Sequence, residues 1–517
     1  MTGRAVASPH RLSAEAGRRI LEAGGNAVDA AIAIVAAQGV VAPETCGLGG
    51  DLFALIHRPG WDKPLALNSS GRAGSNADGS ELAKQGLRDI PADHPLVVTV
   101  PGCVDGLVTL SQELGSIPLG DALAPAIELA RDGFPASTEQ SRAFTIQADR
   151  YRDNPAVACF YPGGRPVAPG DHVTRPELAA TLEALAETGE RDTFYLGPPG
   201  EDIVEALGGT ITMDDLAKTQ AEWVEPVALE TLGHVAWTIP PNSQGYLGPA
   251  TLAVFEMLDP PDDPDDPRWW HLLIESYRCI AWERDDVVTD PGTAPLTPGL
   301  LVDRDRLRRW AETIGERAGS WPDTPHRTHG TAYMCAADTD GMGVSIIQSN
   351  YYGTGSPFGA ARSGFLLHDR GRGFTLTPGH PNEVLPGKRP MHTLSPTLWT
   401  RGSDPAWLIG TRGGDIQPQL VAQLAARIVG ARIDPATAQT MPRWAMAEFG
   451  PGSGSRVRVE PDTPTAVVED LRERGHEIEV VDGPQTGWGP MSVIGLDGDV
   501  RVAANDPRVD TTAAYVF

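Results

Sequence analysis

Apolar residues at helical spacing fill the first part of the chain. Residues 13–25 have apolar positions three and four apart and end in Gly-Gly, which predicts an amphipathic helix. Residues 26–41 start with an asparagine and are apolar on nearly every side, which predicts a second, buried helix. Residues 46–60 are typical of a glycine-rich turn followed by a strand. The chain therefore begins with a helical pair that leads into a sheet.

The character of the pattern changes after residue 330. Before it, helical patterns dominate, including amphipathic helices expected at residues 122–137 and 270–288. After it, short apolar runs are separated by Gly, Asp and Pro turns, which predicts strands, and one long helix is expected at residues 417–430. This distribution favours a layered α/β fold with helices outside a sheet sandwich.

Composition and charge limit the classes of partner. The 517 residues suffice for two to four domains or for one large unit. A net charge of -26 argues against nucleic acid and against an anionic membrane surface, because both would repel the chain. No apolar run reaches a membrane-spanning length, and the first residues lack the pattern of a secretory signal. We therefore expect a cytoplasmic protein.

Cysteines and metal motifs indicate no cofactor. The five cysteines are widely spaced and odd in number, which argues against a disulfide framework or a zinc site. The H-E-x-x-H, phosphate-loop and G-x-S-x-G motifs are absent. The glycine-rich stretch at 410–415 has two interpretations: a tight turn, or a pair of backbone N–H groups aimed at a developing oxyanion. We expect neither a metal nor an organic cofactor.

The stretch HRTHGTAYMCAADTDG, residues 326–341, contains the best candidate nucleophile. Thr331 starts an apolar strand pattern, and a threonine in such a place usually serves the strand. It becomes a nucleophile when the peptide bond before it is cut, because its own α-amine then acts as the general base. That amine titrates near pH 8, close enough to neutrality to accept the hydroxyl proton. Gly330 supplies the small residue that such a bond favours.

The chain resembles the γ-glutamyltransferases (glutathione hydrolases), a family of N-terminal-nucleophile hydrolases. The similarity covers nearly the whole chain, and its motifs follow the family's order and spacing. These motifs are GGNAVDAAIA, GLGGD.F, VPGCVDGL, GFPAS, HLLIESYRCIAWERDDVVTDP, DTDGMGVSIIQSNYYGTGS, SGFLLHD, PGKRPMHTLSPTL and GTRGGDIQPQ.

The resemblance implies a four-layer αββα sandwich made as an inactive precursor. Cleavage between Gly330 and Thr331 would give fragments 1–330 and 331–517, which remain one catalytic unit as a heterodimer. A dimer of such heterodimers is an open alternative. In the family the nucleophile lies seven residues before the first Asp of a D-x-D-G turn, here Asp338, and this spacing selects Thr331. Thr328 is the alternative, but it lies ten residues before Asp338 instead of seven.

The resemblance also implies the other site residues. The supporting hydroxyl of the family corresponds to Ser349, with Asn350 beside it. The glycine pair of the oxyanion hole corresponds to Gly413 and Gly414. The family's serine-pair motif corresponds to MHTLSPT, with His392 and Thr393 as substrate-binding residues.

Two departures from the family pattern concern the substrate. Arg72 is shifted by two positions from the family's pocket arginine. Where the family has an acid that binds the substrate's α-amine, this chain has GRGF, with Arg370 and Arg372 nearby. A pocket with arginines but no acidic residue would suit a substrate that has a carboxylate and lacks the α-amine. The alternative is that Arg370 and Arg372 are surface charges.

The expected function is amide hydrolysis or acyl transfer of the γ-glutamyltransferase type, through an acyl-enzyme on Thr331. The substrate would be a small amide that carries a carboxylate. One alternative is hydrolysis of a small amide acid such as oxamate, which belongs to a side branch of the family. Another is a catalytically inactive member that only binds a carboxylate ligand.

Overall fold

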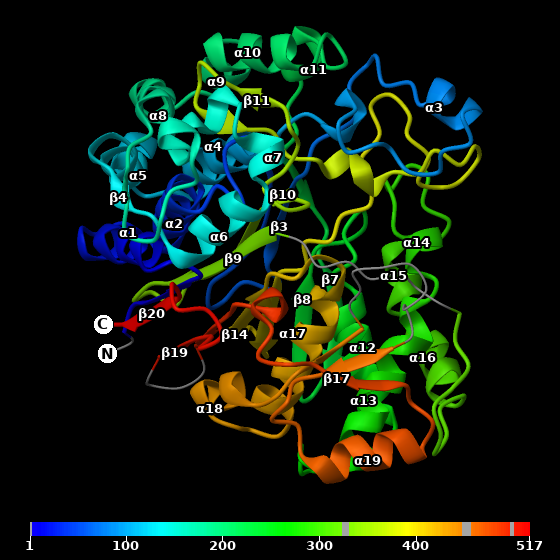
Figure 1. Cartoon of the computed structure of the whole chain (residues 1–517). Coiled ribbons are helices and arrows are strands. Elements are labelled where there is room, and N and C mark those ends of the chain that lie inside the picture. Colours follow the sequence, from blue (N-terminus) through cyan, green and yellow to red (C-terminus); the bar gives the residue numbers. More distant parts are fainter. Residues whose placement is uncertain (1–2, 323–329, 447–455, 497–500) are drawn as a thin grey trace.

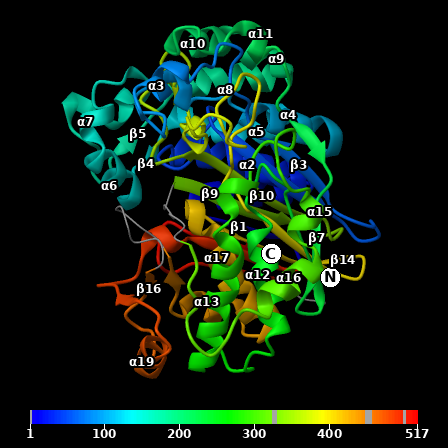
Figure 2. The same ribbon diagram turned by 90° about the vertical axis from the view of Figure 1, so that its right-hand side faces the viewer.

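Two antiparallel sheets lie face to face in the middle of the molecule, and helices cover the outer face of each (Figure 1, Figure 2). The result is the expected four-layer αββα sandwich. The computed structural model describes residues 3–322, 330–446, 456–496 and 501–517. None of the described helices combines the length and hydropathy that crossing a membrane requires.

The first sheet has seven strands, and its middle is formed by β9 (Gly330–Ala337) and β10 (Gly343–Tyr351). In order across the sheet, the strands are β20 (Ala513–Val516), β1 (Ala5–Ser8), β9, β10, β2 (Asp51–His57), β3 (Leu65–Ser69) and β6 (Glu222–Val224). At the β1–β20 edge, Arg4 and Phe517 exchange two backbone hydrogen bonds, so the two ends of the described chain lie side by side (Figure 1).

The second sheet has six strands, again drawn from both sides of residue 330. In order, they are β19 (Val502–Asn505), β18 (Met491–Gly495), β14 (Asp404–Thr411), β13 (Thr397–Arg401), β8 (His234–Thr238) and β7 (Val227–Thr231). Each sheet therefore contains strands from both of the expected fragments, 1–330 and 331–517.

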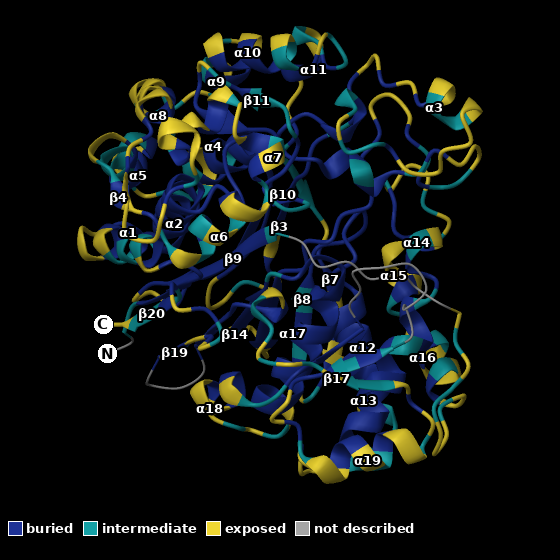
Figure 3. Cartoon of the chain, in the orientation of Figure 1, coloured by how far each residue is buried: buried dark blue, intermediate teal, exposed yellow. Residues whose placement is uncertain are grey.

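The helices pack in two outer layers. On the first sheet lie α1 (Arg11–Glu22), α2 (Ala27–Val41) and α4 (Cys103–Leu114), with α5 (Leu119–Asp132) behind α2. On the second lie α12 (Leu247–Met257), α17 (Gln417–Ala425) and α18 (Pro435–Thr440), with α13 (Pro267–Ala281) behind α12. Every residue of α2 is buried, and Asn26 caps its first turn in a capping box. The buried layers are seen in Figure 3.

Shorter elements complete the described chain. The helices are α3 (Ser80–Lys84), α6 (Thr138–Ile146), α7 (Ala148–Tyr151), α8 (Pro176–Thr188), α9 (Arg191–Tyr195), α10 (Pro198–Ala206), α11 (Met213–Leu216), α14 (Arg284–Val287), α15 (Pro298–Leu301), α16 (Arg304–Ala311) and α19 (Thr465–Glu473). The strands are β4 (Phe134–Pro135), β5 (His172–Val173), β11 (Gly359–Ala360), β12 (Phe365–Leu366), β15 (Trp444–Ala445), β16 (Val457–Val459) and β17 (Ile478–Val480).

Most expected elements are confirmed, with two differences in extent. The helix expected at 270–288 is divided into α13 and α14. The helix expected at 417–430 leaves the α conformation after α17 and ends as a π-helix at Ala426–Gly430. All five cysteines are free thiols; four are buried, and Cys159 is of intermediate exposure.

The two sheets are in close contact where Tyr333 of β9 lies over Gly410 of β14. A Cβ added at Gly410 would lie 2.3 Å from a carbon of the Tyr333 ring, so the sheets can approach this closely because position 410 has no side chain. The Tyr333 hydroxyl is hydrogen-bonded to Ser345 Oγ at 2.9 Å, which fixes the ring. The contact sets the spacing of the sheets near the start of β9.

The substitution Gly410→Ala tests this contact. Because the new methyl group has no room, we expect the free energy of unfolding to fall by about 1–3 kcal/mol. Gly299→Ala in α15 is the control, since a Cβ there meets nothing within 4 Å. Urea unfolding followed by circular dichroism measures both. Equal stability of the two variants would contradict the proposed role of Gly410.

Candidate active site

Thr331 occupies the second position of β9, at the centre of the first sheet, and is 1% exposed. Its Oγ1 donates a hydrogen bond to the carbonyl oxygen of Gly330 at 2.7 Å. Gly330 itself is tightly enclosed, because a Cβ there would lie 2.6 Å from the carbonyl oxygen of Gly353 and 3.0 Å from that of Glu44. The close backbone approach explains why the strand begins with a glycine.

Ser349 lies directly opposite Thr331 on β10, with the two hydroxyl oxygens 3.2 Å apart. Its Oγ accepts from the Tyr351 N–H at 2.8 Å and from Arg370 Nη2 at 3.4 Å, and it donates to the Gly330 carbonyl at 2.9 Å. A serine oxygen has two acceptor lone pairs and one proton. With both lone pairs engaged, the proton can go only towards Gly330 or Thr331.

Arg370 is completely buried beneath Ser349. Its guanidinium stacks on the Tyr351 ring at 3.8 Å, and its Nη1 donates to Thr393 Oγ1 at 3.3 Å. The Nε atom lies 3.6 Å from Asp51 Oδ2. Burial lowers the pKa of Arg370, and the neighbouring Tyr351 and Asp51 oppose that shift. The interpretation of Arg370 as a surface charge is therefore wrong.

Asp51, at the start of β2, is the carboxylate of this cluster. His392 donates from Nε2 to Asp51 Oδ2 at 3.1 Å, since its Nδ1 accepts from the Leu394 N–H. Burial would raise the pKa of Asp51, but the His368 ring, the His392 hydrogen bond and Arg370 outweigh it and hold the pKa below its usual value. Burial and Arg370 lower the pKa of His392 to about 3, so its ring is neutral. The sequence interpretation missed Asp51 and His368, although both lie in quoted motifs.

Gly413 and Gly414 form the turn between β14 and α17, with φ of 136° and 60°, angles that favour glycine. In the described part of the chain, their N–H groups donate to no acceptor. Gln244 Nε2 holds the Gly414 carbonyl at 3.1 Å. The glycine pair thus has two N–H groups available for an oxyanion.

The packing of β14 on β9 shows where this turn lies. Leu408 touches Gly343, which pairs with Ala337 at the far end of β9, and Gly410 touches Tyr333. Because the two facing strands run in opposite directions, the end of β14 near Gly413 lies at the same end as the start of β9, where Thr331 is. The glycine turn and the threonine lie at the same end of the two facing strands.

Three residues expected to bind substrate have their side chains engaged by other groups of the protein. Arg72 is half-buried and forms ion pairs with Glu222 at 2.8 Å and Asp290 at 3.4 Å, with no contact to Thr331 or Ser349. The Asn350 side-chain amide donates to the carbonyls of Pro43 and Thr354. Arg372 stacks on Tyr352 and pairs with Asp369 at 3.3 Å.

A cavity of about 370 Å³ adjoins the cluster. Tyr351, Met391 and Asp415 line this cavity. Each is within two positions along the chain of a candidate site residue, namely Ser349, Thr393 or Gly414. Arg372 and Asp285 are among its other charged walls. Residues distant in sequence thus bring carboxylates as well as arginines to this cavity, which the motif around Arg370 alone did not indicate. We call this space the charged cavity.

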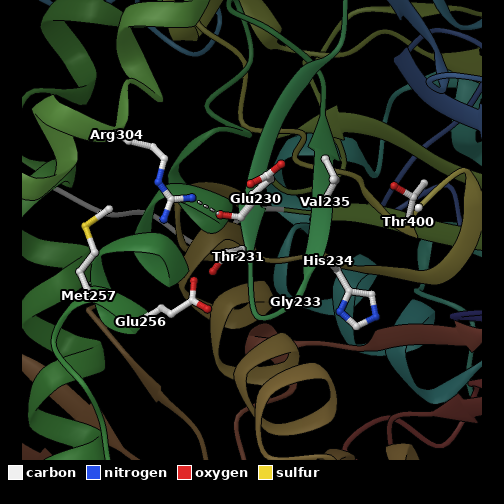
Figure 4. A pocket seen from close by; sticks show the side chains of 10 residues that line it. Glu230, Thr231, Gly233, His234, Val235, Glu256, Met257, Arg304 and Thr400 are labelled. Atoms are coloured by element: carbon white, nitrogen blue, oxygen red, sulfur yellow. Dashed lines mark hydrogen bonds between the residues drawn. The ribbon is translucent and has the colours of Figure 1, made fainter.

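Another cavity, of about 560 Å³, lies at the opposite end of the second sheet (Figure 4). It is formed by the β7–β8 turn, with Glu230 and His234, and by Thr400 near the β13–β14 turn, with Arg304 and Glu256 facing it. These turns are at the strand ends remote from Gly413. Among the described residues, no three His, Cys, Asp or Glu side chains are placed to hold a metal ion.

Comparison with known proteins places the chain in a family. The family described as Gamma-glutamyltranspeptidase matches residues 13–516. The chain is 35% identical to the Glutathione hydrolase-like YwrD proenzyme of Bacillus subtilis, over 100% of the chain and 99% of that protein. It is 32% identical to the Oxamate amidohydrolase proenzyme of Klebsiella pneumoniae, over 99% and 98% respectively.

A solved structure has the same fold over the whole chain. The cephalosporin acylase from Bacillus halodurans superposes with a TM-score of 0.90 and 32% sequence identity, covering 99% of this chain and 95% of that one. Fold, motifs and whole-length similarity agree, and the chain belongs to the γ-glutamyltranspeptidase family of hydrolases.

Proposed function

We propose that the chain is an autoprocessing amidohydrolase whose nucleophile is Thr331, freed as a new N-terminus by cleavage after Gly330. The observation that carries this proposal is the contact of two hydroxyls, Thr331 Oγ1 and Ser349 Oγ, with the single carbonyl of Gly330. Relatives described as proenzymes support it.

Self-cleavage starts from this arrangement. Thr331 Oγ1 attacks the Gly330 carbonyl carbon, its proton passes to the leaving Thr331 nitrogen, and the peptide bond becomes an ester. Water then hydrolyses the ester, leaving a carboxylate on Gly330 and a free α-amine on Thr331. Ser349, which donates to the Gly330 carbonyl oxygen, stabilises the negative charge that develops there.

Turnover repeats the chemistry on an external amide. The Thr331 α-amine takes the hydroxyl proton, Oγ1 attacks the amide carbonyl, and the Gly413 and Gly414 N–H groups bind the oxyanion. The protonated amine supplies the proton that the departing nitrogen needs. Water, or an acceptor amine, then releases the acyl group from the threonine.

Arg370 acts as a positioning residue for Ser349. Its donation to the serine oxygen, together with that of the Tyr351 N–H, leaves the serine proton for the Gly330 carbonyl. Asp51 keeps the guanidinium in place, because a buried charge without a partner is strongly unfavourable.

The charged cavity supports a γ-glutamyl-type acyl group. Its walls carry both arginines and carboxylates, which match the opposite charges of an α-amino acid head. Hydrolysis of a small amide acid is the alternative, favoured by the resemblance to oxamate amidohydrolase. An inactive, carboxylate-binding chain remains the third hypothesis.

Thr331→Ala tests the nucleophile. We expect the native chain to run as two bands on a denaturing gel, corresponding to residues 1–330 and 331–517, and the variant to run as one, because no hydroxyl can attack Gly330. The control is Thr328→Ala; Thr328 lies outside the described residues, and this variant should still give two bands. A single full-length band from the native chain would contradict self-cleavage.

Arg370→Met and Arg372→Met form a matched pair. Loss of a hydrogen bond from a charged donor corresponds to roughly a 10- to 100-fold effect, so Arg370→Met should slow self-cleavage by about that factor. Arg372→Met should be processed normally and should raise KM for a carboxylate substrate. Time courses on gels give the first rate. Partial recovery with Arg370→Lys, alongside equal thermal stability, separates positioning from a folding defect, and unchanged processing in Arg370→Met would exclude the role.

Two substrates that differ in one amino group test the acyl specificity. We expect γ-glutamyl p-nitroanilide to be hydrolysed with at least about tenfold higher kcat/KM than glutaryl p-nitroanilide, because only the former has an ammonium for the acidic walls. Release of p-nitroaniline measures both. Preference for the glutaryl compound, or faster ammonia release from oxamate, would favour the alternative function. Full processing without turnover of any of these would leave the binding hypothesis.

A further inference from the structure

An apolar groove of about 950 Å³ adjoins the charged cavity. It lies between the segment around α3 and the segment 376–386, which run beside each other in Figure 1. Its apolar lining, which defines the apolar groove from here on, consists of Ala77, Ala83, Leu87, Leu376, Val384 and Leu385. A volume of this size is at the upper end of the range for small-molecule sites.

The groove is a built feature, because its two walls are joined by backbone hydrogen bonds. Leu376 N–H donates to the Arg88 carbonyl at 2.8 Å, and Gly387 N–H donates to the Ala73 carbonyl at 2.9 Å. Between these bonds, a Cβ at Gly79 would lie 2.6 Å from Leu376 and 2.7 Å from Val384. Gly79 therefore allows the walls to meet beneath the groove.

The groove continues the space of the candidate active site. Arg88 and Thr377 line both the apolar groove and the charged cavity. The chain also passes directly from one to the other, since Asn382 lines the charged cavity and Glu383 the groove. A molecule whose charged head occupies the charged cavity can thus extend into an apolar environment.

The order of the reaction identifies which part of a substrate lies there. The acyl group stays attached to the buried Thr331 until water arrives, whereas the amine leaves first and must reach solvent. The groove opens to solvent, because Leu87 and Leu385 on its walls are 38% and 45% exposed. The amine therefore belongs on the groove side of the scissile bond.

We propose that the amide substrate has an alkyl or aryl group on its amine and that the apolar groove binds this group. This inference rests on the proposed amidohydrolase function and specifies its substrate class: a charged acyl head joined to an apolar amine. Burial of each methylene group contributes to binding of the leaving group, and in the transition state to kcat/KM.

A homologous series tests the inference. The γ-glutamyl amides of ammonia, ethylamine, butylamine and hexylamine keep one acyl head and lengthen only the amine. We expect kcat/KM to rise by up to about fourfold for each added methylene. Leu385→Asp, which places a charge on the groove wall, should flatten this increase. It should leave unchanged the kcat/KM of the ammonia amide, which is glutamine and has no alkyl group to bind the groove.

Leu300→Asp is the matched control, because Leu300 is likewise an exposed leucine, 49% accessible, and lies in α15 outside the groove lining. It should show the native dependence on chain length. Turnover that is independent of amine length, or a flat series that becomes steep when the alkyl group is moved to the acyl side, would overturn the inference while leaving the amidohydrolase function intact.

A binding measurement keeps the two proposals separate. If no amide is hydrolysed, the proposed function fails, and calorimetric titration of ethylamine, butylamine and hexylamine still examines the groove. Affinity that increases with chain length in the native protein, but not in Leu385→Asp, supports an apolar amine site. Equal affinity for all three amines refutes it.

Discussion

A guanidinium without access to solvent is the constraint on which the candidate site depends. Arg370 is completely buried, and an unpaired charge there would be strongly destabilising. The surrounding groups meet this requirement together: Asp51 supplies opposite charge, Tyr351 an aromatic face, and Ser349 and Thr393 supply acceptors. These groups come from separate elements. Their contacts with the Arg370 guanidinium therefore fix the relative positions of β2, β10 and the segment before β13.

The same region joins the two parts of the chain that cleavage after Gly330 would separate. β9 pairs with β1 on one side and β10 on the other, and β2, from the first part, continues the sheet beyond β10. A break before Thr331 removes one covalent bond and leaves these ladders in place. In the proposed mechanism, the new N-terminus would stay beside β10, on the kind of rigid support that a nucleophile requires.

The resemblance to the family assigns Ser349 as the partner of Thr331, and the structure brings the two hydroxyls together because the residues are close in the chain. A turn at Asp338–Gly341 joins β9 to β10, and the register that pairs Ala332 with Gln348 brings Thr331 opposite Ser349. The layered fold was also predictable, since α2 and the central strands have clear apolar patterns. The buried charge cluster was not, because Asp51 and Arg370 meet only through tertiary packing. The ion pairs of Arg72 were not predictable for the same reason, since its partners Glu222 and Asp290 are distant in sequence.

The edge pairing of β1 with β20 has a consequence for chain connectivity. Arg4 and Phe517 are hydrogen-bonded neighbours, so a short turn could join the two ends without disturbing the sheet. Opening the ring so formed between Gly330 and Thr331 would give a circular permutant whose first strand is β9. In such a permutant Thr331 follows the initiator methionine, and removal of that residue would expose the α-amine without an internal cleavage. Maturation and catalysis, which the proposed mechanism assigns to the same hydroxyl, would then be separable.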